Sequence, residues 1–380
     1  MAIYYVPSIN LMGAGCLNDL GATVNDLGFK KAFVVTDNFL MSNGVANKVL
    51  NVLEGAGIAY EVYSEVVPNP TCKNVHDGLE RLKETDCDFL VSIGGGSPQD
   101  TAKAIGILAT NGGHIKEYEG VNLSKNKSLP IVAVNTTAGT SSEVTINYVV
   151  TDEERHVKMV MVDKNSLATV TVNDPELMVE KPASLTAATG MDALTHALEG
   201  YITKAHNEMS DMFHIKAIQL IVANLAAAVN EKDKKAINIM GMAQYIAGMG
   251  FSNVGLGICH SMAHQLGAVY DTPHGIANAM LLPTVLEFNG EVCYERYQDI
   301  LKALGYPAEK YTKEETIQTL VDIVRDLAEQ VGITQTISDY GAKLEDLEML
   351  SEKAMEDPCK PGNPREVDVE GFIKLYKKAM

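Results

Sequence analysis

Residues 88–100, DFLVSIGGGSPQD, decide the fold class of this chain. An apolar run at 88–93 ends at three consecutive glycines, and Ser97 and Pro98 then open a segment with helical spacing. A continuous apolar run is typical of a strand buried on both faces, and such strands belong to parallel sheets covered by helices. The segment therefore predicts one β–turn–α unit of an α/β domain.

The same pattern recurs on both sides of this unit. Apolar runs alternate with segments of helical spacing throughout the first half of the chain. The runs lie at 31–36, 58–63, 88–93 and 130–135, with helical segments near 43–55, 73–84 and 98–110. Since crossovers between parallel strands are right-handed, we expect a doubly wound, mostly parallel sheet with helices on both faces.

The second half of the chain has a different hydrophobic pattern. Strand-like runs disappear after Pro182, and 3.6-residue apolar spacing predicts an all-α domain, with Ser184 as the N-cap of its first helix. We therefore expect a dinucleotide-binding α/β domain at 1–182 and a helical metal-binding domain at 183–380. The expected helices lie at 184–203, 208–229, 235–253, 255–269, 275–288, 312–331 and 343–355, with a loop at 357–365 before a last helix.

The composition limits the class of protein. The chain has 380 residues, 46% of them hydrophobic, and a net charge of −18, which argues against nucleic-acid and anionic-membrane partners. No apolar run reaches the roughly 18 residues that a membrane helix needs, and the N-terminus lacks the basic and apolar regions of a signal peptide. The six cysteines are scattered without a CxxC pair, as expected of reduced thiols. We expect a soluble cytoplasmic protein.

Two loops that follow strands have the composition of nucleotide-binding loops. Gly94–Asp100 opens a helix, where glycines allow close approach and free backbone N–H groups favour a phosphate. Thr136–Glu143 offers hydroxyl donors after the run at 130–135. Asp37 ends another strand, where a carboxylate can bind a ribose and favour NAD over NADP. An ordinary glycine turn, a Ser/Thr-rich cap and a helix N-cap at Asp37 are the structural alternatives.

The strongest candidate site contains one carboxylate and four histidines. Asp192 and His196 are four residues apart on an expected helix, as are His260 and His264, and His274 follows in a loop. One carboxylate with three imidazoles suits Fe²⁺ or Zn²⁺, although spacing leaves open which four of the five bind the metal. Isolated histidines are usually structural, and we expect the others at the surface or in the core: His76, His114, His156, His206 and His214.

Four segments together resemble the iron-containing (group III) alcohol dehydrogenases, and the resemblance spans essentially the whole chain. The segments are GGGSPQD (94–100), TTAGTSSE (136–143), ATGMDALTHALEGY (188–201) and GICHSMAHQLGAVYDTPHGIANA (257–279). The resemblance implies a dehydroquinate synthase-like architecture with a metal, Fe²⁺ or alternatively Zn²⁺ or Mn²⁺, in the cleft between two domains. It also implies an NAD-dependent, homo-oligomeric enzyme that interconverts a short primary alcohol or diol, such as 1,3-propanediol, and its aldehyde.

The resemblance implies roles for individual residues. Asp192, His196, His260 and His274 would bind the metal, and His264 would be an unligated histidine near the substrate, where it is a candidate proton relay. Phe251 would line the substrate pocket. The residues implied in cofactor binding are Asp37, Asn69, Gly94, Gly95, Gly96, Ser97, Asp100, Thr136, Thr137, Thr140 and Lys158.

Two positions depart from the usual family text, and both lie in the cofactor loops. Gln99 stands where His is common, and Ser141 stands where Gly is common. Alternative activities are those of relatives acting on lactaldehyde, methanol or butanol, and of zinc-dependent polyol dehydrogenases of the glycerol type, which usually lack the full Asp and three-His set. A lyase of the dehydroquinate synthase type needs a basic cluster, but 258–280 contains no Lys or Arg. A non-catalytic binding module is the remaining alternative.

Overall fold

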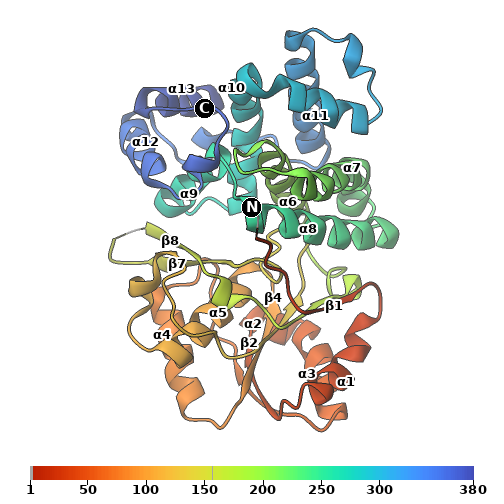
Figure 1. Ribbon diagram of the computed structural model, residues 1–380, viewed down its shortest axis with the longest axis vertical. Helices are drawn as coiled ribbons and strands as arrows, with labels where there is room; N and C mark the ends of the chain where they lie inside the picture. Colours follow the sequence, from red (N-terminus) through yellow and green to blue (C-terminus); the bar gives the residue numbers. More distant parts are fainter. Residues whose placement is uncertain (1–2, 156) are drawn as a thin grey trace. The chain divides into compact units, whose positions relative to one another are not determined.

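The computed structural model describes residues 3–155 and 157–380 (Figure 1). The chain divides into two compact units, one ending at Glu180 and the other spanning Lys181–Met380. The first is an α/β unit and the second is helical, which confirms the predicted fold class. Each unit is described below by itself.

The α/β unit is built on a six-stranded sheet in which every neighbouring pair is parallel. The strand order is β1-β9-β6-β4-β2-β3. The strands are β1 (Ile9–Met12), β2 (Lys31–Val35), β3 (Ala59–Tyr63), β4 (Phe89–Gly94), β6 (Ile131–Asn135) and β9 (Val170–Asn173). The central strands β4 and β6 are buried along their whole length, as their unbroken apolar sequence predicts.

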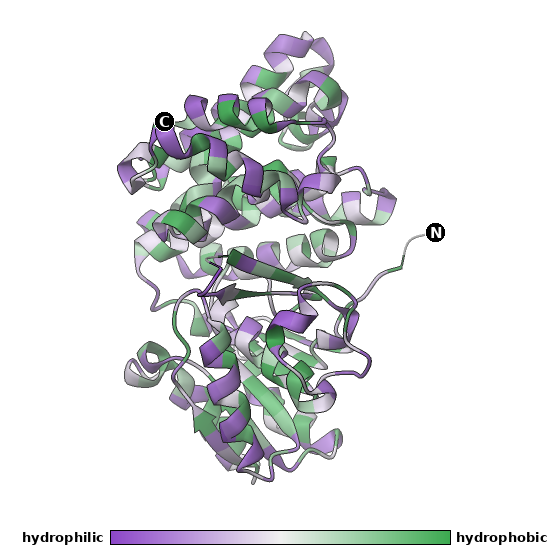
Figure 2. Ribbon diagram, turned by 90° about the vertical axis from the view of Figure 1, so that its left-hand side faces the viewer, coloured by the Kyte–Doolittle hydropathy of each residue, from purple (hydrophilic) through white to green (hydrophobic). Residues whose placement is uncertain are grey.

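Helices cover both faces of this sheet, so it is doubly wound. Alternate residues of β2 face opposite cores: Phe33 packs with the residues of α4 and α5, and Val34 with those of α1 and α3. The helices are α1 (Leu20–Asp26), α2 (Asn38–Ser42), α3 (Val45–Gly55), α4 (Cys72–Lys83) and α5 (Gly96–Asn111). Hydrophobic colour concentrates on the strands and polar colour on the outer helix faces in Figure 2.

A small second sheet follows the 136–145 loop. It pairs β7 (Asn147–Asp152) antiparallel with β8 (Val157–Val162), and β5 (Gly120–Val121) joins β8. The short 3₁₀ turns of this unit are Cys16–Asp19, Ile115–Tyr118, Lys164–Ser166 and Pro175–Leu177. Neither the small sheet nor the strands β1 and β9 was expected from the sequence.

The helical unit contains eight α-helices. They are α6 (Ala183–Ile202), α7 (Glu208–Asn230), α8 (Lys234–Val254), α9 (Ile258–Tyr270), α10 (His274–Ala303), α11 (Lys313–Gln330), α12 (Leu347–Glu356) and α13 (Val369–Ala379). Side-chain caps begin several of them, as at Thr312, which forms a capping box with Glu315. Short 3₁₀ turns lie at Ala308–Lys310, Ile337–Tyr340, Leu344–Asp346 and Lys360–Gly362.

Three details of the helical unit differ from the prediction. Ser184 is not the N-cap of α6, because Pro182 takes that position and caps without a side-chain bond. The helix expected at 275–288 continues to Ala303, with a kink at Cys293. Helix α7 is long and apolar enough to pass for a membrane span, with a mean hydropathy of 1.6 over 18 residues, although it packs along α6 and α8 as a bundle helix does.

Candidate metal centre and nucleotide-binding loops

Three helices of the helical unit bring the four expected ligands together. Asp192 and His196 lie one turn apart on α6, His260 lies in the first turn of α9, and His274 is the first residue of α10. One ligand atom from each falls within 4.8 Å of the others. The chain reverses between α9 and α10 through Asp271, whose positive φ of 54° makes the turn that returns His274 to the cluster.

The donor set fits a divalent transition metal. Oδ1 of Asp192 lies 3.5 Å from Nε2 of His274, 3.8 Å from Nε2 of His260 and 4.0 Å from Nε2 of His196. Tetrahedral donors bonded at about 2.1 Å lie about 3.4 Å apart, so only a small contraction is needed. A carboxylate with three imidazole nitrogens is a set that iron and zinc both accept. These residues could therefore hold one metal ion.

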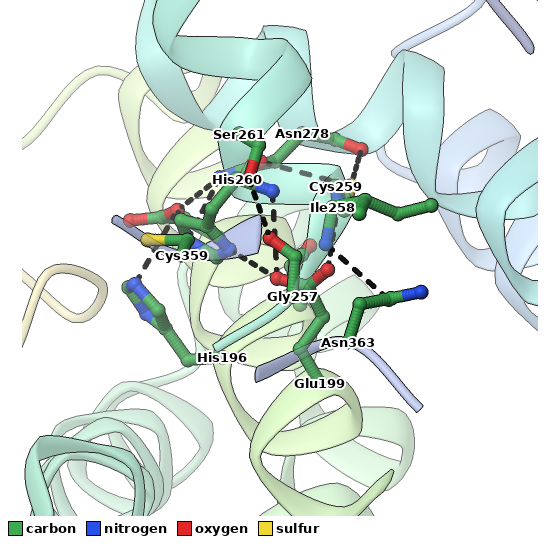
Figure 3. A network of polar contacts seen from close by, with 12 residues as sticks. His196, Glu199, Gly257, Ile258, Cys259, His260, Ser261, Asn278, Cys359 and Asn363 are labelled. Carbon is green, nitrogen blue, oxygen red and sulfur yellow. Dashed lines mark hydrogen bonds and ion pairs between the residues drawn. The ribbon is translucent and has the colours of Figure 1, made fainter. Parts of the chain in front are cut away.

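Two further side chains contact the ligands directly, and the sequence analysis missed both. Glu199, on α6, accepts a hydrogen bond from Nδ1 of His260 at 2.6 Å (Figure 3). Asn278, on α10, donates from Nδ2 to Oδ1 of Asp192 at 2.8 Å. The signal for Glu199 was present, because it lies seven residues after Asp192 on the same helix face.

His264 lies one turn beyond His260 on α9, outside the four-ligand group. Its Nδ1 hydrogen-bonds to Oδ2 of Asp357 at 2.8 Å, and the rings of His264 and His274 stack 5.3 Å apart. Burial raises the pKa of Asp357, but His264 and other hydrogen-bond donors outweigh burial and hold it below its ordinary value. Asp357 is 93 residues away in sequence, in the expected 357–365 loop, and no local pattern pointed to it.

Phe251, expected to line the substrate pocket, lies on α8 against the metal-ligand group. Its ring stacks on that of His196, with centroids 4.2 Å apart and planes 11° apart. The side chain is buried. The contact fixes one face of His196, so Phe251 is a packing partner of this imidazole.

The two expected nucleotide loops pack against each other in the α/β unit. Gly94 ends β4 and Gly96 begins α5, and a Cβ at Gly95 would lie 2.7 Å from Cγ2 of Thr137. A Cβ at Gly96 would lie 3.2 Å from Cγ2 of Thr140. Ser97 lies in the first turn of α5, and Thr136 donates its N–H to the Gly94 carbonyl. Glycine is required here for close approach of the loops, and this places backbone N–H groups at a helix start.

A buried lysine and a buried aspartate anchor the second loop. Lys103 donates from Nζ to the carbonyls of Ser142, Thr145 and Asn147 at 2.5 to 2.8 Å. Asp100 accepts from the Ser142 hydroxyl at 2.6 Å, and burial raises its pKa to about 6. Asp100 therefore holds the loop together within the protein, and a direct cofactor contact remains a prediction.

The other expected cofactor residues lie in the same unit, Asp37 and Asn69 in loops and Lys158 on β8. Asp37 is the N-cap of α2 and accepts from the Leu40 N–H at 2.8 Å, which is the structural role weighed for it. Nζ of Lys158 donates to Oδ1 of Asn69 at 2.8 Å, so these two expected cofactor residues lie next to each other. A ribose contact at Asp37 stays a prediction.

The two departures from the family text have structural consequences. Gln99 is buried, and its Nε2 donates to the carbonyls of Gly94 and Val134, which ties β4 to β6. Ser141 has a φ of 56°, in the left-handed region that favours glycine. Its side chain is accommodated, but the backbone carries the strain that a glycine would avoid.

Of the four remaining histidines that the structure describes, His214 has the most unusual surroundings. It is fully buried between α6 and α8, where a Cβ at Gly200 or Gly250 would come within 2.3 Å of its Nε2. Neither ring nitrogen has a hydrogen-bond partner among the described residues. Burial lowers its pKa to about 3. His156 lies outside the described residues.

Comparisons with known proteins show the family of the chain. Residues 7–175 match the family described as iron-containing alcohol dehydrogenase, and residues 186–380 match the C-terminal region of the Fe-containing alcohol dehydrogenase family. The chain therefore belongs to the iron-containing alcohol dehydrogenase family.

Individual relatives cover nearly the whole chain, and their names differ in substrate. The chain is 46% identical to lactaldehyde reductase of Escherichia coli, over 97% of this chain and 96% of that protein. It is 42% identical to 1,3-propanediol dehydrogenase of Citrobacter freundii, over 99% of this chain and 98% of that protein. A crystal structure of 1,3-propanediol oxidoreductase, 42% identical, matches all of both chains with a TM-score of 0.97.

Proposed function

We propose that this protein is an NAD-dependent, metal-dependent alcohol dehydrogenase that interconverts a short primary alcohol or diol and its aldehyde. The observation that carries the proposal is the convergence of Asp192, His196, His260 and His274 on one point. The membership of the chain in the iron-containing family supports Fe²⁺ as the metal, and the donor set also accepts Zn²⁺ or Mn²⁺. When bound, the metal supplies Lewis-acid polarisation of the substrate oxygen and NAD accepts the hydride.

The chain's own residues bind and orient these groups. In the α/β unit, Gly94, Gly95, Gly96 and Ser97 offer backbone N–H groups to the pyrophosphate, beside hydroxyls of the facing loop. The hydroxyl residues and remaining cofactor contacts are proposed as Thr136, Thr137, Thr140, Asn69, Lys158, Asp37 and Asp100. The packing of the two loops supports this assignment.

His264 is proposed to move the proton that leaves or enters the substrate hydroxyl. Its Nδ1 is held by Asp357, so its Nε2 is the atom that exchanges the proton. Replacement of His264 by Gln should lower kcat by about 10² to 10⁴-fold and change the pH–rate profile, while metal content stays stoichiometric. A variant with the wild-type rate and profile would remove His264 from the mechanism.

The substrate is proposed as 1,3-propanediol with 3-hydroxypropionaldehyde. The match to the 1,3-propanediol oxidoreductase structure supports it, and the 46% identity to lactaldehyde reductase favours 1,2-propanediol with lactaldehyde as the second candidate. Phe251 is proposed to wall the pocket, beside His196. We propose that the enzyme acts in the cytoplasm as a homo-oligomer, which light scattering of the purified protein tests.

Steady-state kinetics after anaerobic iron loading tests the proposal. The panel contains 1,3-propanediol, 1,2-propanediol, methanol and butanol, each with NAD and with NADP. We expect alcohol-dependent reduction of NAD, with the highest kcat/KM for 1,3-propanediol. Nucleotide and metal binding without turnover of any alcohol would instead indicate a non-catalytic binding protein.

A further inference from the structure

Glu199 is a buried carboxylate with three contacts on α9. Oε1 accepts from the N–H of Cys259 at 2.7 Å, and Oε2 accepts from Nδ1 of His260 at 2.6 Å and from the His260 backbone N–H at 3.4 Å (Figure 3). The side chain is 1% exposed. The free N–H groups of the α9 N-terminus thus hold the carboxylate in place, and the carboxylate in turn holds His260.

These contacts determine which ring nitrogen of His260 carries a hydrogen. A carboxylate oxygen only accepts hydrogen bonds, so Nδ1 of His260 must be the donor, and in a neutral imidazole Nε2 then keeps its lone pair. Asn278 is compatible with the same assignment from the other side. Its Nδ2 donates one hydrogen to Oδ1 of Asp192, and the second is shared between Nε2 of His260 at 3.2 Å and Nε2 of His274 at 3.3 Å.

We propose that Glu199 is a positioning residue of the metal centre, which fixes the Nδ1–H tautomer of His260 and so determines metal affinity. The inference rests on the proposed metal site and goes beyond its four ligands. A metal requires the Nε2 lone pair, and a partner on the other ring nitrogen typically changes metal affinity 10 to 100-fold. Glu199 is suited to this role because it shares one face of α6 with Asp192 and His196.

Substitution of Glu199 by Gln separates this role from simple packing. The amide oxygen of the new side chain can still accept from the Cys259 N–H, which leaves its NH₂ group facing Nδ1 of His260. Two donors cannot share that contact, so the ring adopts the Nε2–H tautomer, which has no lone pair for a metal. The substitution changes the side-chain volume little and keeps the acceptor for the Cys259 N–H, while the weaker contact with the His260 backbone N–H is lost.

The chain offers a matched control. Asp357 makes the same kind of contact with Nδ1 of His264, which is not among the four ligands. Asp357→Asn therefore also removes a buried carboxylate from a histidine of α9, outside the four proposed ligands. Because His264, Asp357 and Cys359 form a second group whose atoms could hold an ion, the comparison uses the first equivalent of Zn²⁺ that binds. The probe is Zn²⁺, titrated into metal-free protein in competition with a chromophoric chelator, so the readout does not depend on turnover.

We expect Glu199→Gln to weaken Zn²⁺ binding about 10 to 100-fold, and Asp357→Asn to bind Zn²⁺ within threefold of wild type. Wild-type affinity in Glu199→Gln, or an equal loss in both variants, would overturn the inference. Failure of the wild-type protein to bind Zn²⁺ or Fe²⁺ would instead contradict the metal site itself.

A second measurement does not depend on the folding of any variant. Long-range ¹H–¹⁵N correlation spectra of the metal-free wild-type protein distinguish the two tautomers, and His260 is assigned by the signal lost in His260→Gln. We expect the Nδ1–H pattern at His260. An Nε2–H pattern there would contradict the inference even if Glu199→Gln did not fold.

Discussion

Gly275 follows the ligand His274 at the start of α10, and its substitution by Ala should damage the metal centre through the backbone. A Cβ at this position would lie 2.1 Å from the carbonyl oxygen of Ala188 on α6, whereas real Cβ atoms essentially never approach within 3.0 Å. The obstacle is backbone, so it cannot rotate away. The start of α10 must move from α6 by about 1 Å, at a cost of about 1–3 kcal/mol.

This movement has a calculable effect on the ligand geometry. Nε2 of His274 lies 3.5 Å from Oδ1 of Asp192. A further 1 Å or so brings the separation to about 4.5 Å, about 1 Å more than the roughly 3.4 Å between tetrahedral donors bonded at about 2.1 Å. Binding through His274 then requires a much larger contraction, and metal affinity should fall by about 10 to 100-fold, the range for losing even an indirect contact.

Zn²⁺ titration and thermal unfolding of the metal-free protein test this prediction together. Gly275→Ala should fold, melt at a lower temperature and bind Zn²⁺ weakly. Gly55→Ala is the matched control, because Gly55 is also helical but a Cβ there meets nothing within 4 Å. Wild-type Zn²⁺ affinity in Gly275→Ala would refute the geometric argument.

Three further predictions concern other parts of the chain. Gly95→Ala should weaken NAD binding about tenfold or more in calorimetry, because its Cβ would lie 2.7 Å from Thr137; unchanged affinity would contradict the loop assignment. Ser141→Gly should stabilise the protein by about 1 kcal/mol in urea unfolding, since φ is 56°; no gain would mean that the backbone is unstrained. His214 has its pKa lowered to about 3 from 6.5, so below pH 6.5 the unfolded chain binds a proton that the folded chain does not. Stability is therefore complete above pH 6.5 and falls towards pH 3, by about 2 kcal/mol at pH 5. His214→Phe should remove that part of the pH dependence, and parallel stability–pH curves would refute it.

The sheet was largely readable from the sequence because its central strands are buried on both faces. The runs that became β2, β4 and β6 contain three or more consecutive apolar residues, whereas β3 is an edge strand interrupted by Glu61 that was identified by its place after a helical segment. The strands β1 and β9 were not predicted because each is only four residues long. Neither is set off from the neighbouring loops by an adjacent helical segment of clear spacing. Short edge elements carry too few residues for periodicity to identify them.

Helix ends were less predictable than helices. Ser184 has the composition of an N-cap, but a cap needs an extended backbone at that residue, and the chain already turns helical at Ala183 after Pro182. Helix α10 was expected to end at 288, but it continues through a kink at Cys293 to Ala303. Such outcomes depend on packing against other helices, which local sequence does not encode.

The metal ligands were predictable as pairs but their supporting contacts were not. Spacing of four residues placed Asp192 with His196 and His260 with His264, and only the resemblance to a family selected His260 and His274 as ligands. Asn278 contacts Asp192, and Asp357 contacts His264, and in both cases the partner is distant in sequence. No local sequence pattern therefore predicted either contact.

Metal stoichiometry, measured by elemental analysis after anaerobic loading with Fe²⁺, tests the central claim most directly. The wild-type chain should hold one equivalent, and the separate variants His260→Ala and His274→Ala should hold almost none. A full equivalent of metal retained in either variant, or none in the wild type, would contradict the assignment of these imidazoles and the chemistry proposed for them.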